Sequence, residues 1–470
     1  MERYPALGSV SLAQWLEGQD TERLNRYRQY LDFYEGQQWE RRRRGNETRL
    51  TINYARALVR KVASYVFPEP VVFSVPESAE AERVLNELAA EQDWHGLDYQ
   101  TVVDAAVLGD GAFKVTWDGE SQRPVVAAVD PATLWAWTRP DNVRALTRVM
   151  QRYTLSAGEA EALLPPLGPP VNGGKTKNTP VNGGRARSTS VNGEKGSPDA
   201  PAGGAQVAVV EDWTAERLVI EAGGQVVRDE PNPYGWIPYV LFPNVPRPHS
   251  LWGESDLADL LDVCRELNRR MTVLSKILQV SGNPIVVLEN VTGSQGIRAD
   301  EGAVWELPED SRAYLLDMLS GGGVRLHIEY VELLYRALYD LAETPRSAFG
   351  DSGRNLSGTA LEVEIQPLVQ KVQRKRRVWD SVYRRRNAMV LELLERFGGH
   401  QFGGVRRTEV VWGPILPRDR EALVRSEARL VASGIHSRRT AMVALGETGP
   451  EEEWARVLEE LEAWDRGGKP

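Results

Sequence analysis

The sequence predicts an α+β protein that is mainly helical and divided into several structural units. The chain has 470 residues, which is too long for one compact core and indicates roughly two to four units. Its hydrophobic fraction of 41% and charged fraction of 26% are typical of a folded globular protein. Short β-rich segments separated by Gly, Pro, Asp and Asn occur in the first half, whereas long segments with apolar residues at helical spacing dominate the second half.

Charge and cysteine content exclude several classes of protein. The formal net charge of -9 argues against a protein that coats DNA, although it allows one that lies close to DNA without gripping it. Cys264 is the only cysteine, so the chain can form neither an intramolecular disulfide nor a cysteine-based zinc cluster, which fits a reducing compartment. The first residues contain no apolar core of a signal peptide, and no apolar stretch approaches ~20 residues. We therefore expect no membrane segment, and we expect no metal and no cofactor.

The N-terminal half alternates between helix and strand patterns. Apolar residues recur at helical spacing in four segments, which are 11–36, 51–67, 78–93 and 99–111. Short runs rich in β-branched and other apolar residues predict six strands, which are 71–75, 112–117, 124–129, 145–155, 206–214 and 217–222.

Residues 156–205 differ in composition from the segments around them. A ten-residue unit begins at Val171, at Val181 and at Val191, and the stretch is rich in Gly, Pro, Asn, Ser and Thr. Such a composition cannot bury enough apolar surface to offset the entropy of ordering. The unit is also short for a solenoid repeat, and only its valine could contribute to a core. We predict a loop inserted between two strands, with the low-complexity repeat over residues 165–203.

Two long helices are predicted in the middle of the chain, over residues 254–281 and 324–343. Ser255 is the expected N-cap of the first helix. Each helix carries one apolar seam close to a heptad repeat. The seam residues are Leu257, Leu260, Leu261, Cys264, Leu267, Met271, Leu274 and Leu278 in the first helix, and Val324, Ile328, Val331, Tyr335, Leu338 and Leu341 in the second. A compact insertion with strand patterns at 285–289 and 303–307 separates the helices.

A loop after Pro345 leads into a helical pattern that runs to about Arg396. Pro367 interrupts this pattern and should kink the helix. Residues 409–413 predict a strand, and residues 417–466 are helical and strongly charged.

The loop contains Gly350-Asp351-Ser352-Gly353, which matches the sequence around the nucleophile of trypsin-like proteases. Such a site needs a histidine held by a buried carboxylate. None of the five histidines lies in a protease-like context, and the loop joins two helices rather than strands of a double β-barrel. We therefore expect no catalytic residue and interpret the glycines as a source of flexibility.

Two further motif matches are incomplete. The stretch "GPPVNGGKT" has Pro169 where a phosphate-binding loop needs its first glycine, and it lacks the flanking strand and helix. His327 and Glu329 form an H-x-E pair without the cysteines of a zinc deaminase. Neither match supports a nucleotide or metal site.

A basic run over residues 371–386 has Trp379 and Tyr383 interleaved. It either contacts DNA phosphates or forms a solvated or intersubunit helix face paired with acidic neighbours. The residues of this candidate face are Lys371, Arg374, Arg377, Arg384 and Arg385.

Three stretches and their order resemble the portal proteins of tailed double-stranded DNA bacteriophages, in particular the siphophage-type family. The first is a Pro-rich strand followed by "LWGESDLADLLDVCRELNRRMTVLSKILQVSGNPIVVLEN". The second is the helix over 324–343, which ends in "ETPRSAFGD". The third is "NLSGTALEVEIQPLVQKVQRKRRVWDSVYRRR", which opens the long kinked helix. The N-terminal stretch "FYEGQQW…TINYARALVRKVASYVFPEPVVFSV" adds a weaker match.

The resemblance implies a portal subunit with four named parts and a long kinked helix. They map by position as wing 1–252 with a return strand at 400–416, stem helices 253–282 and 323–344, clip 283–322, tunnel loop 345–357, kinked helix 358–399 and crown 417–470.

The resemblance also implies roles for particular residues. The tunnel loop would ring a DNA channel, with Arg354 and Asn355 as the candidates to touch phosphate. Its residues are Arg346, Ser347, Gly350, Ser352, Gly353, Arg354, Asn355 and Ser357. Subunit packing in the stem would use Leu257, Leu260, Leu267, Met271, Leu274, Val331 and Leu338.

The partners implied by the resemblance are about twelve copies of the chain itself in a ring, since head-to-tail contacts close into rings. Double-stranded DNA, a large terminase, a head–tail connector, and the major capsid and scaffold proteins complete the set. The virion is the implied location, with the host cytoplasm during assembly. Three alternatives remain open at this stage: a connector or scaffold protein without a channel, a hydrolase using Ser352, and a nonspecific DNA-binding protein.

Overall fold

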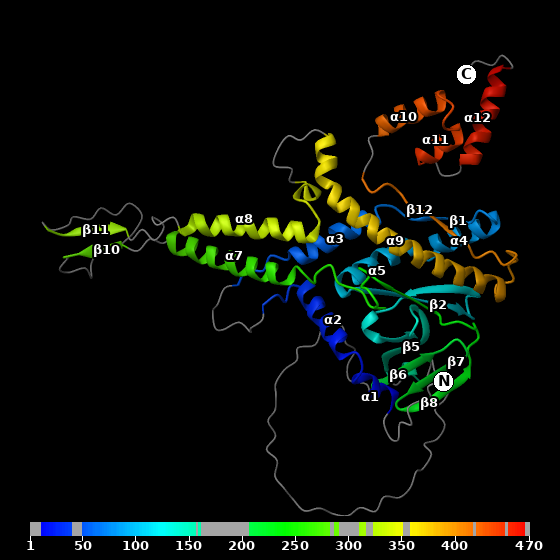
Figure 1. Cartoon of the computed structure of the whole chain (residues 1–470), viewed down its shortest axis with the longest axis horizontal. Coiled ribbons are helices and arrows are strands. Elements are labelled where there is room, and N and C mark those ends of the chain that lie inside the picture. Colours follow the sequence, from blue (N-terminus) through cyan, green and yellow to red (C-terminus); the bar gives the residue numbers. More distant parts are fainter. Residues whose placement is uncertain are drawn as a thin grey trace, which may run out of the picture. The chain divides into compact units, whose positions relative to one another are not determined.

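The computed structural model describes residues 11–39, 49–156, 158–160, 206–282, 286–290, 310–315, 323–350, 358–416, 420–446 and 450–465 (Figure 1). The chain divides into two compact units. The first comprises Met1–Phe67 with Val71–Val411, and the second comprises Pro68–Pro70 with Trp412–Pro470. Helices and small sheets occur together in the first unit, so the predicted α+β class is confirmed.

Five helices form the N-terminal part of the first unit. They are α1 (Leu12–Glu17), α2 (Thr21–Tyr34), α3 (Tyr54–Val66), α4 (Ala79–Glu91) and α5 (Trp94–Leu108). The prediction of one helix over 11–36 was wrong, because Gly18 ends α1 and Asp20 adopts a left-handed φ of 52° before α2 begins. Side chains of Asn53, Ser78 and Asp93 cap the following three helices by accepting a backbone N–H.

The strands of the first unit form four antiparallel sheets. A three-stranded sheet has the order β3-β2-β9, and a five-stranded sheet has the order β4-β5-β6-β7-β8. Their strands are β2 (Asp110–Asp118), β3 (Arg123–Ala128), β4 (Leu134–Arg139), β5 (Asn142–Ser156), β6 (Gln206–Trp213), β7 (Arg217–Ala222), β8 (Gln225–Pro231) and β9 (Tyr239–Pro243). The sequence analysis missed β4 and β8; β8 is an edge strand whose side chains are largely exposed, so it lacks an apolar pattern.

The two strands on either side of the predicted insertion, β5 and β6, pair with each other. Ser156, the last residue of β5, pairs directly with Gln206, the first residue of β6. The repeat over 165–203 lies outside the described residues.

Two small sheets complete the set. One joins β1 (Val72–Ser74) to β12 (Glu409–Val411), and the other joins β10 (Val286–Glu289) to β11 (Arg312–Leu315). The strand predicted at 303–307 lies outside the described residues, and the partner of β10 was not foreseen.

Helices α7 (Leu261–Gly282) and α8 (Gly323–Ala342) lie side by side (Figure 1). The prediction that the first of them begins near residue 254 was wrong, because residues 256–260 form turns. Ser255 therefore caps a turn rather than the helix, and its hydroxyl accepts the amide of Leu257 at 3.0 Å.

The structure assigns five of the seven predicted stem-packing residues to the core of the subunit itself. Leu257, Leu260, Leu267, Val331 and Leu338 are each at most 7% exposed. They form one cluster with residues of α2, α3 and α5, so side chains of their own chain cover them. Met271 is half-buried at the edge of the same cluster, and Leu274 is half-buried in α7.

Helix α9 (Gly358–Arg396) continues through Pro367 without interruption. Figure 1 shows that its first, yellow turns run in a different direction from the rest, as expected where proline removes a backbone hydrogen bond. The helix packs against α3, β2 and β9. Trp379 lies at the centre of this contact, with ring centroids 4.8 Å from Phe67 and 5.0 Å from Phe242.

Arg386 and Asp98 form a fully buried ion pair that joins α9 to α5. The Arg386 guanidinium donates to Asp98 at 2.6 Å, and Tyr383 donates to the other carboxylate oxygen at 2.9 Å. The guanidinium also lies over Trp94, 4.2 Å from the ring centroid. Aromatic faces attract such a cation, which compensates part of its desolvation.

The second unit contains α10 (Arg420–Ala432), α11 (Arg438–Ala444) and α12 (Pro450–Asp465), in the region predicted to be helical. His436 and Glu427 lie 2.8 Å apart and hold the turn between the first two helices. Among the helices that the structure describes in either unit, none combines the length and the apolar character of a transmembrane segment.

Replacing Arg386 by Met should lower the free energy of unfolding by about 3–5 kcal/mol, because Asp98 would remain buried without a counter-charge. Urea unfolding followed by tryptophan fluorescence measures this. Arg384→Met is the matched control, since Arg384 is exposed two positions earlier, and its change should stay within about 0.5 kcal/mol. Equal losses in both variants would contradict the assignment.

Candidate functional site at the base of the α7–α8 pair

The stretch Gly253-Glu254-Ser255-Asp256-Leu257 forms the junction between the β-sheets and α7. The Gly253 amide donates to the Asp110 carboxylate at 2.7 Å. A Cβ atom on Gly253 would lie 2.5 Å from Pro243 Cβ and 2.7 Å from the Gly109 carbonyl oxygen. Only glycine allows the chain to pass this closely.

Ser255 connects this junction to the end of α5. Its hydroxyl lies 3.0 Å from the Ala106 carbonyl oxygen and 2.5 Å from that of Val107. The last carbonyls of a helix have no partner inside the helix. The Asp256 amide donates to the Ala106 carbonyl oxygen at 2.9 Å, so the single hydroxyl proton of Ser255 is available to the Val107 carbonyl oxygen. The side chain thereby fixes the start of the α7 segment against α5.

Asp256 lies between two lysines of α9. Its carboxylate is 2.9 Å from Lys375 Nζ and 3.8 Å from Lys371 Nζ, and all three side chains are at most 11% exposed. Asn244 donates to the same carboxylate at 3.1 Å and accepts a hydrogen bond from Lys375. Lys371 also donates to the Ala342 carbonyl oxygen at 3.0 Å, at the C-terminal end of α8. One buried cluster therefore joins the residue after β9, the turn before α7, the end of α8 and α9.

Electrostatics explain how one carboxylate serves two lysines. Burial alone would raise the pKa of Asp256, but Lys371 and Lys375 outweigh it and lower that pKa to about 2. Burial lowers the pKa of Lys375, and Asp256 opposes this change. The carboxylate is thus the essential anion of the cluster.

The predicted basic face divides into two groups of side chains. Lys371 is buried and lies 3.8 Å from the Asp256 carboxylate of its own chain. Arg374 is exposed and pairs with Glu343 at 2.5 Å, whereas Arg385 donates to the Leu241 carbonyl oxygen at 3.0 Å. Arg377 and Arg384 are exposed and form no salt bridge with any described residue.

The inward-facing cations could have been found from their spacing. Lys371, Lys375, Trp379, Tyr383 and Arg386 follow one another at intervals of three or four, which places them on one helix face together with the aromatic residues. A cation on an aromatic, apolar face needs a buried partner. Asp98, Asp256 and Lys375 form buried ion pairs that the sequence patterns did not predict.

The predicted tunnel loop is described only in its first part. Arg346 is exposed in a 3-10 turn over Arg346–Phe349, and Ser347 is largely buried. Gly350 ends this turn with a φ of +86°, a conformation that favours glycine. Ser352, Gly353, Arg354, Asn355 and Ser357 lie outside the described residues.

The arrangement of Asp256, Lys371 and Lys375 holds helices together. Within the described ranges, no group of three or more His, Cys, Asp or Glu side chains could hold a metal ion. Glu329 of the H-x-E pair is engaged with Arg325 at 2.8 Å.

A comparison with protein-family models matches residues 13–160 and 209–466 to the family described as phage portal protein, SPP1 Gp6-like. The match covers most of the chain. The chain belongs to this family of phage portal proteins. A comparison with curated proteins found no match. Phage portal proteins are a structural, non-enzymatic family.

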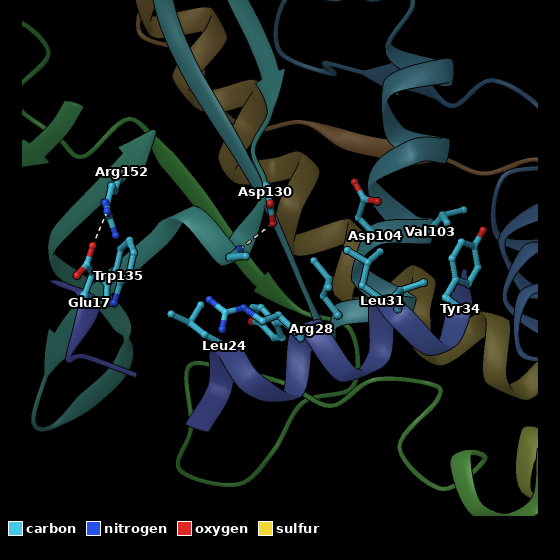
Figure 2. Close-up of a pocket in the computed structure, with 14 residues that line it drawn as sticks. Glu17, Leu24, Arg28, Leu31, Tyr34, Val103, Asp104, Asp130, Trp135 and Arg152 are labelled. Atoms are coloured by element: carbon cyan, nitrogen blue, oxygen red, sulfur yellow. Dashed lines mark hydrogen bonds and ion pairs between the residues drawn. The ribbon is translucent and has the colours of Figure 1, made fainter. Parts of the chain in front are cut away.

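The portal protein also has a pocket between α2, α5 and the five-stranded sheet (Figure 2). Its volume is about 470 Å³, and its walls combine apolar and charged residues. An ion pair between Arg152 and Glu17 lies at one end, and Asp104 and Asp130 line another part of the wall. Burial raises the pKa of Asp104 to about 6, with a further contribution from the charge of Asp130.

Replacing Asp256 by Asn in the portal protein should lower the free energy of unfolding at pH 7 by about 3–5 kcal/mol, since two buried lysines would lose their anion. Asp262→Asn is the control, because that side chain is 95% exposed. The folded pKa of Asp256 lies below its unfolded value, so its stabilisation is complete above about pH 4 and disappears as the pH falls through about 2. Urea unfolding across this range should show the variant and the wild type converging at acid pH.

Replacing Asp104 by Asn should raise the melting temperature at pH 7.5 and leave it unchanged at pH 4. The folded pKa of Asp104 lies above its unfolded value, so ionisation destabilises the fold as the pH rises from about 4 through about 6. The side chain still reaches solvent, so the effect is modest. Differential scanning fluorimetry measures it, with exposed Asp259→Asn as the control; a pH-independent difference would contradict this assignment.

Proposed function

We propose that this portal protein assembles into a closed ring of about twelve copies at one vertex of a phage capsid. Double-stranded DNA would pass through the central channel during packaging and ejection. A large terminase and a head–tail connector would dock on the ring, and the major capsid and scaffold proteins would surround it. The family match over most of the chain is the observation that carries this proposal.

The parts of the subunit are proposed by position. The wing would comprise 1–252 and 400–416, the stem 253–282 and 323–344, the clip 283–322, the kinked helix 358–399 and the crown 417–470. Two features support the central part of this division. Helices α7 and α8 pack as a pair, and β10 and β11, between them in sequence, form a separate two-stranded sheet.

DNA contact is proposed for the loop over 345–357, with Arg354 and Asn355 on the phosphates. The exposed arginines of α9 would face either DNA or a neighbouring copy. A channel must let DNA slide, and as few as about 6–10 phosphate contacts already give a strongly salt-dependent grip. The net charge of -9 supports a balanced or acidic lining rather than a uniformly basic one.

Native mass spectrometry and negative-stain images of the purified protein test the proposal. We expect rings of about twelve subunits with an open channel, because head-to-tail contacts close into rings. A monomer or dimer at high concentration across a range of salt would contradict the channel function and favour a connector or scaffold protein.

A further inference from the structure

Helix α8 carries a second apolar face besides the one in the core. Val331 and Leu338 lie on the inner face and are at most 7% exposed. On the other face, Leu326, Leu333 and Leu341 are 68%, 58% and 49% exposed, and Tyr330 is 37% exposed. The spacing of these four residues places them on one side of the helix. We call Leu326, Tyr330, Leu333 and Leu341 the outer stripe of α8.

The outer stripe is unusual because its members are large and adjoin one another. Single exposed apolar residues are normal on a protein surface, but a continuous apolar strip generally marks a contact. Among the residues that the structure describes, the outer stripe is much more exposed than Val331 and Leu338 on the inner face. The stripe also differs from the predicted stem seam, whose central residues are already buried within one chain.

The charges on the two helices indicate what covers the stripe. Residues at one edge of it are mostly acidic, with three acidic and two basic side chains: Arg325, Glu329, Glu332, Arg336 and Asp340. The solvent-reaching charges of α7 are mostly basic, with four basic and two acidic side chains: Asp262, Arg265, Glu266, Arg269, Arg270 and Lys276. Helix α7 also has two half-buried apolar residues among these charges, Val273 and Ile277.

We propose that the outer stripe of α8 packs on Val273 and Ile277 of α7 in a neighbouring copy of the same chain. The contact pairs an acidic edge with a basic one and is complementary in charge. It joins unlike surfaces, so it is heterologous and propagates around a ring. The proposal rests on the proposed ring and names the surfaces that hold it together.

The first experiment compares the wild type with the Leu326→Asp/Leu333→Asp double variant by native mass spectrometry. Both leucines are exposed in the subunit, so the variant should keep the helical content seen by circular dichroism and lose the ring. Val226→Asp is the control, because Val226 is 58% exposed on β8, outside the stripe, and its rings should persist. Intact rings in the double variant would overturn the inference and leave the ring itself standing. A wild type without rings would instead overturn the proposed function.

Cysteine cross-linking then tests which surfaces meet. Leu333→Cys and Val273→Cys are made as separate single variants, with Cys264 left in place because it is buried. The two variants are mixed and assembled together. The mixture should give disulfide-linked dimers on a non-reducing gel, whereas each variant alone should give none. Dimers from Leu333→Cys alone would show that α8 meets α8, which overturns the inference. Rings without any cross-link in the mixture would also overturn it.

Discussion

The balance of charge around Asp256 holds together segments that are far apart in the chain. One buried carboxylate faces two lysines of α9, and these lysines also bind Asn244 and the end of α8. A buried ion cluster contributes less to stability than its Coulomb attraction suggests, because its members lose their hydration. Its geometric requirement is strict, however, since any displacement leaves a charge without a partner. The relative positions of α7, α8 and α9 at this junction therefore follow from one anion.

Helix α9 combines two roles along the same residues. Its inner face carries Lys375, Trp379 and Arg386 into the core, where each has ionic or aromatic partners. Its outer face carries Arg377 and Arg384 in solvent. A basic sequence therefore does not by itself define a nucleic-acid surface, because three of the eight cations over residues 371–386 face buried aspartates.

The sequence predicted most helices because their apolar periodicity is strong, as in α3, α4 and α8. It failed where periodicity does not determine the backbone. The apolar seam continues through Leu257 and Leu260, but Ser255 is held by the end of α5, so turns precede α7. The sequence could not show whether the apolar seam is buried within one chain or between two chains, because the heptad pattern is the same in both cases. Partners such as Asp256 and Lys375 are more than a hundred residues apart in the sequence. Residue periodicity within one helix does not predict contacts between such distant segments.

The direct pairing of Ser156 with Gln206 has a consequence for how this protein tolerates change. Strands β5 and β6 pair in register from Val149 to Ser156, and residues 157–205 lie between them in the sequence. Lengthening such a connection costs little free energy, about 0.6 kcal/mol for each doubling. We therefore expect deletions or duplications of the ten-residue unit to leave the pairing of β5 and β6 unchanged. The position offers evolution, and the protein engineer, a place to display new sequence on an unchanged scaffold.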